Sequence, residues 1–516
     1  MSKRILRLIL GDQLNSQHSW FNQIDPEIHY LMMEIGQELR YVTHHIQKIA
    51  AFFLAMRNFC LEKTKDGHWF IYMRLEDPEN SQNLSQNIKD ILKKGNYTQF
   101  QYLLPDEYRL DQELNTLIHE IETIYKIPAK GFDTEHFFTD RKYLERESKG
   151  RKVYLMETFY RKLRMDQNIL ISEDGPEGGL WNLDKENRKP YDFKTTIPPP
   201  KTFSHNASPI RKTLDSMGFS YIGQMKEDRL TWPVSRTEAL EGLSYFVENL
   251  LPNFGQFEDA MVQNEPNLFH SRLSFSLNIK LISPHEVIQS CLLAYYKDPT
   301  KYSLASVEGF IRQILGWREF MRGQYWATMP KFSSLNFFNH SRKLPSWFWT
   351  GNTKMNCLHQ SISDSLTYGY AHHIQRLMIT GNFSLLSGFH PDEVDQWYLG
   401  IYIDAIEWVE ITNTRGMSQW ADGGIIASKP YVSSGNYISK MSNYCKSCIY
   451  DSKKRSGEKS CPFNSLYWAF FLNHKRQLEK NFRLTMVYKN IEKLNPLEIE
   501  KIQNQAQYYI SHLESL

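Results

Sequence analysis

Short apolar runs alternate with amphipathic segments over the first quarter of the chain. An apolar run that ends at a Gly-Asp pair is typical of a buried parallel strand, and apolar residues spaced by three and four are typical of a helix. Segments with these patterns lie at 4–10, 41–59, 69–75, 84–92 and 100–104, as strand, helix, strand, helix and strand. Their alternation predicts a doubly wound α/β domain over residues 1–140.

The pattern changes after this region. Six prolines and three glycines between 174 and 209 predict a long connector with little regular structure, inside a linking region at 141–234. Long loops in compact proteins often carry function. A plain tether between two domains fits the same composition equally well.

Helical patterns dominate the rest of the chain. Ser235 and Glu238 fit a capping box, and amphipathic stripes predict helices at 307–326 and 370–380. We therefore expect an all-α domain over 235–516.

Composition narrows the possible functions. The chain has 516 residues, 14% aromatic residues and a net charge of +3, so any nucleic-acid surface must be a local patch. It lacks the glycine-rich dinucleotide and P-loop fingerprints. No apolar run reaches the roughly 18 residues of a membrane helix, and no secretory signal is visible. We expect a cytoplasmic protein with no membrane partner.

Three cysteines form the sharpest local motif. Cys445, Cys448 and Cys461 are spaced C-x2-C-x12-C, and a C-x2-C turn lets two thiolates reach one metal centre. Cys357 or His474 is the candidate fourth ligand. The spacing alone leaves zinc and an iron–sulfur cluster open, and three unrelated thiols are the alternative.

Two further motifs suggest polar ligands. His373, Arg376 and Leu377 share one face of the predicted 370–380 helix, which suits a buried anionic or proton-accepting ligand. A buried core His beside a surface Arg is the alternative. Ser271 and Ser274 precede an apolar segment, where they either cap a helix or bind phosphate at its N-terminus.

Aromatic and basic clusters are less specific. Trp397, Tyr398 and Trp408 lie close together in the sequence, with Trp349 upstream; such rings are usually core, and a redox role requires a nearby cofactor. Segment 429–459 has seven basic and two acidic residues, a charge that fits phosphate contacts or a solvated loop.

Taken together, these segments resemble one family, the cryptochrome/photolyase superfamily. The most similar branch is that of the iron–sulfur bacterial cryptochromes and photolyases, which includes the prokaryotic (6-4) photolyases. The matching segments are LGDQL at 10–14, YVTHH at 41–45, GGLWN at 178–182, HSRLS at 270–274, GWREF at 316–320, and the stretches 372–383, 408–417 and 445–462. Their order, with four cysteines in the right places, makes the resemblance specific.

The resemblance implies a light-driven DNA repair lyase that reverses (6-4) pyrimidine photoproducts in UV-damaged DNA. It implies an α/β domain that holds a 6,7-dimethyl-8-ribityllumazine antenna, and a helical domain that holds FAD and a 4Fe-4S cluster. We expect a monomer. A blue-light photoreceptor with the same cofactors is the main alternative, and repair of single-stranded or cyclobutane lesions is a third.

The resemblance also implies roles for individual residues. The cluster ligands are Cys357, Cys445, Cys448 and Cys461. FAD contacts are Ser271, Leu273 and Ser274 at the pyrophosphate, and Gln313, Trp317, Arg318, His373, Arg376 and Asp404 around the flavin. Glu410 faces flavin N5, where typical photolyases carry Asn, and Ile406 replaces an Asp that many relatives have.

Three more sets complete the expected site. The residues that match the light-driven electron route to the flavin are Trp397, Tyr398 and Trp349. Those that match antenna contacts are Gly11, Asp12, Glu38 and Tyr41. Tyr431 and His373 match the lesion pocket, and His373 is the expected proton donor or acceptor.

Overall fold

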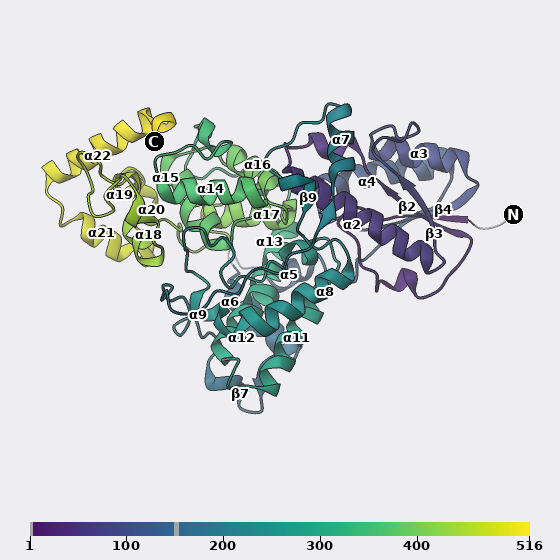
Figure 1. Cartoon of the computed structure of the whole chain (residues 1–516), viewed down its shortest axis with the longest axis horizontal. Helices are drawn as coiled ribbons and strands as arrows, with labels where there is room; N and C mark the ends of the chain where they lie inside the picture. Colours follow the sequence, from purple (N-terminus) through teal and green to yellow (C-terminus); the bar gives the residue numbers. More distant parts are fainter. Residues whose placement is uncertain (1–3, 149–153) are drawn as a thin grey trace.

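The computed structural model describes residues 4–148 and 154–516. Its N-terminal part is built on a five-stranded parallel sheet, seen in purple and blue in Figure 1. The strands are β1 (Arg4–Leu8), β2 (Ile28–Met33), β3 (Trp69–Met73), β4 (Tyr97–Leu103) and β5 (Ala129–Phe132). Their order is β3-β2-β1-β4-β5, so the winding reverses at β1. Ligands of open α/β sheets bind beyond the strand ends at such a point.

Helices cover both faces of this sheet, as the predicted doubly wound fold requires. Along β2, Leu31 and Met33 pack with α3 and α4, whereas Tyr30 and Met32 face the other side and pack with α2. The helices of this part and of the linking region are α1 (Gly36–Arg40), α2 (Ile46–Lys65), α3 (Leu84–Lys94), α4 (Tyr108–Glu120), α5 (Tyr143–Glu147), α6 (Met156–Asp166) and α7 (Ser208–Ser216).

Two predictions in this part need correction. The helix expected at 41–59 begins only at Ile46, because His45 is extended and its ring accepts a hydrogen bond from the Gln47 N–H, which caps the helix. Strands β2 and β5 lie outside the predicted segments. β5 reads AKGF, too short and too polar to stand out as an apolar run.

The linking region is largely irregular between 174 and 209, as its composition predicts. Besides the helices α5, α6 and α7, the linking region contains the short strand pairs β6 (Ile171–Ser172) with β7 (Gly175–Pro176), and β8 (His205–Asn206) with β9 (Arg229–Leu230). The capping box predicted at Ser235 is incomplete. The Ser235 hydroxyl accepts a hydrogen bond from the Glu238 N–H. A complete capping box also requires the Glu238 carboxylate to accept from the Ser235 N–H, but here it accepts from the Val234 N–H.

The rest of the chain is helical (Figure 1). Its α-helices are α8 (Arg236–Tyr245), α9 (Leu251–Phe257), α10 (Ser274–Asn278), α11 (Pro284–Lys297), α12 (Leu304–Ile311), α13 (Glu319–Thr328), α14 (Asn356–Tyr368), α15 (Asn382–Ser387), α16 (Pro391–Ile401), α17 (Glu407–Ile411), α18 (Gly435–Met441), α19 (Pro462–Asn473), α20 (Lys475–Leu478), α21 (Thr485–Ile491) and α22 (Pro496–Ser511). One apolar core joins this part to the sheet, since Ile9 and Ile49 belong to the same cluster as Leu273 and Phe310. In the two described stretches, no helix is long and apolar enough to cross a membrane.

Wider, π-helical turns interrupt the helices around the expected site. The predicted helix at 307–326 is α12 and α13 joined by the π-helical segment η6 (Arg312–Arg318). The helix predicted at 370–380 begins at His373 and continues as the π-helical segment η9 (Gln375–Gly381). Ala371 and His372 therefore precede the helix. π-Helical turns are rare and occur often at functional sites.

Candidate active site

An ion pair links two of the expected flavin residues. Arg376 binds Asp404 through two hydrogen bonds, Nη1 to Oδ1 at 2.9 Å and Nη2 to Oδ2 at 3.1 Å. The Ser274 hydroxyl donates to Asp404 Oδ2 at 2.5 Å, and the Asn278 amide donates to the Asp404 carbonyl at 2.7 Å. Helix α10 and segment η9, far apart in sequence, therefore meet on one carboxylate.

The chain before α10 lines an opening of about 510 Å³. Ser271 and Leu273 belong to its wall, and the Ser271 hydroxyl accepts a hydrogen bond from the Leu273 N–H. Neither Ser271 nor Ser274 caps α10, so the capping interpretation is wrong. His270 Nε2 and Ser276 Oγ in the same wall are buried and have no hydrogen-bond partner among the described residues. Such a wall fits a polar ligand.

Two buried ionisable groups of the helical part also have polar atoms without a hydrogen-bond partner among the described residues. Glu410 on α17 is buried, and its Oε1 has no hydrogen-bond partner within the described chain. Burial, reinforced by the charge of Asp395, raises the pKa of Glu410 well above its usual value. The Arg318 guanidinium donates to Asn278 Oδ1 through Nη2 but leaves Nε and Nη1 unsatisfied. Open donors and acceptors of this kind suit a ligand that has both.

The other expected flavin residues lie close by in the chain. Gln313 and Trp317 belong to the same π-helical segment as Arg318, and the Gln313 amide donates to the Gly309 carbonyl at 3.3 Å. Ile406 is buried and precedes α17, and its carbonyl accepts hydrogen bonds from the Val409 and Glu410 N–H groups.

His373 and His372 have different surroundings. His373 is solvent-exposed, yet burial within the protein, with the charges of Arg376 and Arg188, lowers the pKa of its ring to about 4. His372 is 1% exposed, and its ring stacks on His270 at a centroid distance of 4.4 Å. The two histidines therefore cannot play the same part.

Tyr431 shares a charged neighbour, Arg188, with His373. Burial raises the pKa of its hydroxyl, and the charges of Arg188 and Arg483 oppose that rise. Arg188 thus acts on both His373 and Tyr431. The sequence motifs did not single out Arg188, which comes from the irregular connector and has no local signature.

Aromatic side chains connect the surface to the Arg376 backbone. Trp349 is 43% exposed and directly follows Phe348. The Trp397 indole donates to the Phe348 carbonyl at 3.1 Å, and its ring centroid lies 5.4 Å from that of Tyr398. The Tyr398 hydroxyl donates to the Arg376 carbonyl at 2.7 Å. Trp397 and Tyr398 are therefore in contact, and Trp349 is one residue from the carbonyl that Trp397 binds.

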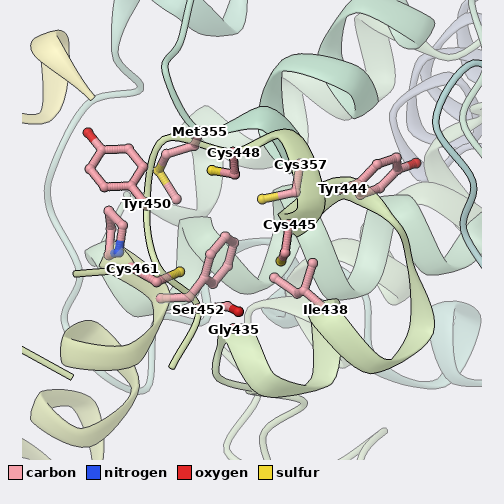
Figure 2. Close-up of a pocket in the computed structure, with 12 residues that line it drawn as sticks. Met355, Cys357, Gly435, Ile438, Tyr444, Cys445, Cys448, Tyr450, Ser452 and Cys461 are labelled. Carbon is pink, nitrogen blue, oxygen red and sulfur yellow. The ribbon is translucent and has the colours of Figure 1, made fainter. Parts of the chain in front are cut away.

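Four cysteines line one cavity (Figure 2). The cavity has about 320 Å³ of free space, part of it open to solvent. Cys357 comes from α14, Cys445 and Cys448 from the loop after α18, and Cys461 from the N-terminus of α19. Burial and the neighbouring thiols raise the pKa of Cys461 to about 12, that of Cys445 to about 11, and that of Cys357 well above its usual value.

The alternative ligand His474 is excluded from this cavity. Its ring packs on Phe338 at 4.4 Å and Nδ1 lies 2.8 Å from the Gln477 amide oxygen. Over 4–148 and 154–516, no three His, Cys, Asp or Glu side chains are close enough to hold a single metal ion.

The expected antenna residues form a network with partners that the sequence motifs missed. Arg109 binds Glu38 through two hydrogen bonds at 2.9 and 2.6 Å, and its guanidinium lies 4.3 Å from the centre of the Tyr41 ring. Lys280 donates to the Asp12 carbonyl at 2.7 Å and to its carboxylate at 3.1 Å. The chain at Gly11 passes close to α2, since a Cβ there would lie 3.0 Å from a methionine sulfur.

Comparison with known proteins decides the family. The chain is 39% identical over 486 residues to a (6-4) photolyase of Agrobacterium fabrum, an overlap of 94% of each protein. The chain belongs to the cryptochrome/photolyase superfamily. Residues 7–230 also match the family model of deoxyribodipyrimidine photo-lyase-related proteins. An uncharacterized mimivirus protein, R855, is 33% identical over 97 residues, which cover 19% of this chain and 72% of that protein.

Solved structures of the superfamily share the fold. A class III photolyase from Agrobacterium tumefaciens superposes with a TM-score of 0.55 at 15% identity, over 83% of this chain and 82% of that one. A Synechocystis cryptochrome gives a TM-score of 0.54 at 15% identity, over 81% and 82% of the two chains. At this identity the likeness concerns the fold, which photolyases and cryptochromes have in common.

Membership of the superfamily implies a flavin cofactor. The unsatisfied atoms of Glu410, Arg318 and His270 fit a ligand that combines a hydrogen-bonding ring with a phosphate group. The ion-paired Arg376 adds a fixed positive charge beside them.

Proposed function

We propose that the protein is a light-driven (6-4) photolyase that repairs UV-damaged DNA. The near full-length match to the Agrobacterium (6-4) photolyase carries this proposal. The expected lesion residues His373 and Tyr431 support it, because the charge of Arg188 acts on both and a lesion inside a duplex must be turned out of the stack into a pocket before chemistry reaches it.

FAD is the cofactor in this proposal. Ser271, Leu273 and Ser274 hold its diphosphate, and the flavin residues of the resemblance line its ring. Bound and reduced, FAD supplies the electron that light drives into the lesion. Asp404 orients Arg376 through two hydrogen bonds, so this cation needs no rearrangement when the cofactor enters. Glu410, whose raised pKa favours the protonated carboxyl, offers a hydrogen-bond donor.

His373 is the proton-transfer residue in this proposal. Repair of a (6-4) lesion moves a proton as well as an electron. The pKa of about 4 keeps the ring neutral at pH 7 in the free protein, with one nitrogen able to donate and the other able to accept. Phosphates of bound DNA would raise the pKa toward neutrality and so match it to the task. Tyr431 forms another wall of the same pocket.

We infer that Cys357, Cys445, Cys448 and Cys461 bind a 4Fe-4S cluster. Four thiols that share one cavity are the donor set of such a cluster, whose several irons join thiolates more widely separated than the ligands of one ion. We also infer that a ribityl-lumazine antenna binds at Gly11, Asp12, Glu38 and Tyr41, and that electrons reach the flavin through Trp349, Trp397 and Tyr398. We assign these roles to an α/β domain at 1–140 and a helical domain at 235–516.

One experiment tests the proposed function. The purified, FAD-loaded and reduced protein is mixed with a duplex that contains one (6-4) photoproduct, illuminated, and digested for chromatography of the nucleosides. We expect light-dependent recovery of the two normal pyrimidines, and no recovery in the dark. A photoreceptor would show flavin photochemistry with no recovery in the light, and would overturn the proposal.

A further inference from the structure

One glutamine side chain fixes the start of the helix that carries His373. The helix begins at His373, so His372 is its N-cap residue and Gln375 its third residue. The Gln375 amide oxygen accepts a hydrogen bond from the His372 N–H at 3.2 Å. This is one half of a capping box, in which the side chain of the third residue binds the N-cap N–H. His373 and Arg376 belong to the same turn, so whatever holds Gln375 also holds them.

The amide nitrogen of Gln375 joins two other elements of the helical part. It donates to Asp364 Oδ2 of α14 at 3.1 Å and to the Tyr444 hydroxyl at 3.1 Å. Gln375 and Tyr444 are each 1% exposed, so both are shielded from water. Each of the two amide N–H groups therefore has an acceptor of its own, and Gln375 makes both bonds only when α14 and Tyr444 keep this spacing.

Both of these elements also carry thiols of the cysteine cavity. Cys357 lies two turns before Asp364 on α14, and Tyr444 directly precedes Cys445. Tyr444 itself lines the cavity, and Figure 2 shows its hydroxyl directed away from the sulfur atoms. Whatever holds Cys357 to Cys445 therefore sets the spacing that the glutamine amide bridges.

We propose that Gln375 is a positioning residue that couples the metal cluster of the cysteine cavity to the start of the His373 helix. A cluster bound to Cys357 and Cys445 fixes α14 against Tyr444, and Gln375 passes this fixed spacing on to the turn that carries His373. The inference rests on the proposed function in two respects, the cluster at the four cysteines and the role of His373 at the lesion. Coupling between two sites is reciprocal, so a fixed helix start also favours retention of the cluster.

Hydrogen–deuterium exchange tests the coupling in the dark, with no DNA present. Segment 370–377 is followed in the iron-loaded, FAD-bound wild type and in three variants. Tyr444→Phe keeps the ring in the cavity wall but removes one acceptor, and we expect the segment to exchange about tenfold faster, the usual size for a lost buried hydrogen bond. Gln375→Glu keeps an acceptor for the His372 N–H but sets a carboxylate against Asp364, and should have the larger effect. Gln375→Glu combined with Asp364→Asn restores a donor and an acceptor, and should return the exchange toward wild type.

Iron retention supplies a second measurement. An iron chelator is added under anaerobic conditions, and the concentration that removes half of the iron is compared between proteins. We expect this concentration to be about tenfold lower for Gln375→Glu than for wild type, because the coupling acts in both directions.

Tyr509→Phe is the matched control. It removes another buried hydroxyl, which donates to the Ser460 carbonyl at 2.6 Å beside Cys461 and not to a residue of the His373 helix. This variant should leave the exchange of segment 370–377 as in wild type.

Repair kinetics separate the reaction from binding. A proton-transfer residue must lie within hydrogen-bond reach of the lesion, so a displaced His373 slows the reaction more than it weakens binding. In Tyr444→Phe we expect kcat for light-driven repair to fall about tenfold, while the dark affinity for a duplex with one (6-4) photoproduct stays within about twofold of wild type.

Three results would overturn the inference. These are unchanged exchange of segment 370–377 in Tyr444→Phe, an equal increase in Tyr509→Phe, or a Gln375→Glu protein that retains its iron as firmly as wild type. Repair by a protein that contains no iron would refute the coupling and leave the proposed repair function standing. A protein that shows the expected exchange and iron retention but repairs nothing would refute the proposed function and leave the coupling standing.

Discussion

The flavin hollow, by which we mean the opening before α10 with the adjoining Asp404 and Arg376, and the thiol cavity are prepared for their ligands in opposite ways. In the hollow, Arg376 and Asp404 neutralise each other, and Ser274 adds a third bond to the same carboxylate. In the cavity, burial and mutual repulsion raise the pKa of three of the four thiols, so the thiolate forms that a metal needs are disfavoured until positive charge arrives. The charges of the flavin hollow are therefore paired before a ligand binds, whereas the thiols of the cavity need the positive charge of their ligand before they ionise.

The largest effect should follow from removing a cluster ligand. In Cys357→Ser we expect loss of bound iron and a large fall in the melting temperature, because binding free energy of a structural metal is also folding free energy. Iron and sulfide analysis with thermal unfolding measures both. Cys291→Ser, at a buried thiol of α11 outside the cavity, should keep the iron. If Cys357→Ser keeps its full iron content, Cys357 is not a cluster ligand, and the cavity does not depend on its ligand in the way proposed.

We expect that the His373 side chain, near the flavin hollow, can be removed without unfolding the protein. His373→Ala should lower repair by about 10²-fold or more, the usual size of a lost proton-transfer group, while FAD content and melting temperature stay near wild type. Product chromatography under illumination measures repair. His372→Ala is the neighbouring control: its loss leaves a space beside the stacked His270 ring and should reduce stability more than repair. Wild-type repair by His373→Ala would move the proton transfer elsewhere.

A substitution in the aromatic residues tests whether electrons pass through them between the surface and the flavin hollow. Trp397→Phe keeps most of the packing volume but is much harder to oxidise, so flavin photoreduction should slow at least about tenfold with FAD still bound. Transient absorption after a light pulse measures the rate. Trp420→Phe, at another buried indole that donates to the Ala427 carbonyl, should leave the rate unchanged. If Trp397→Phe reduces the flavin normally, electrons take another route.

Sequence patterns predict the parts of this molecule that depend on near neighbours. The apolar runs of β1, β3 and β4 and the C-x2-C spacing are local, and all were found in the structure where the patterns place them. The edge strand β5 has too few apolar residues to be visible. The π-helical turns that follow His373 and Ile374 were missed because patterns with a period of 3.6 assume an α-helix.

The missing parts of the site are long-range partners. Arg109 meets Glu38 only when the α/β part has folded, and Lys280 meets Asp12 only after the sheet and the helical part have folded onto each other. Arg188, whose charge acts on His373, comes from an irregular connector. No periodicity or spacing in the chain links such residues, so their pairing is a property of the tertiary structure.

The smallest effect should come from the antenna region, which resembles the hollow in being held by ion pairs. Glu38→Gln removes one charge from the Glu38–Arg109 pair that borders Tyr41, a partly exposed pair of the kind that contributes little to stability. We expect the melting temperature and FAD content to remain near wild type while the second chromophore is lost from the absorption spectrum. Repair should then fall only at wavelengths that the antenna absorbs and stay unchanged where the flavin absorbs directly. Glu113→Gln, at a neighbouring carboxylate that binds Gln37 away from Tyr41, should keep the chromophore. If Glu38→Gln also retains the second chromophore, the antenna does not bind at Glu38 and Tyr41. The antenna region and the flavin hollow would then share their ion pairs but not a role in binding a chromophore.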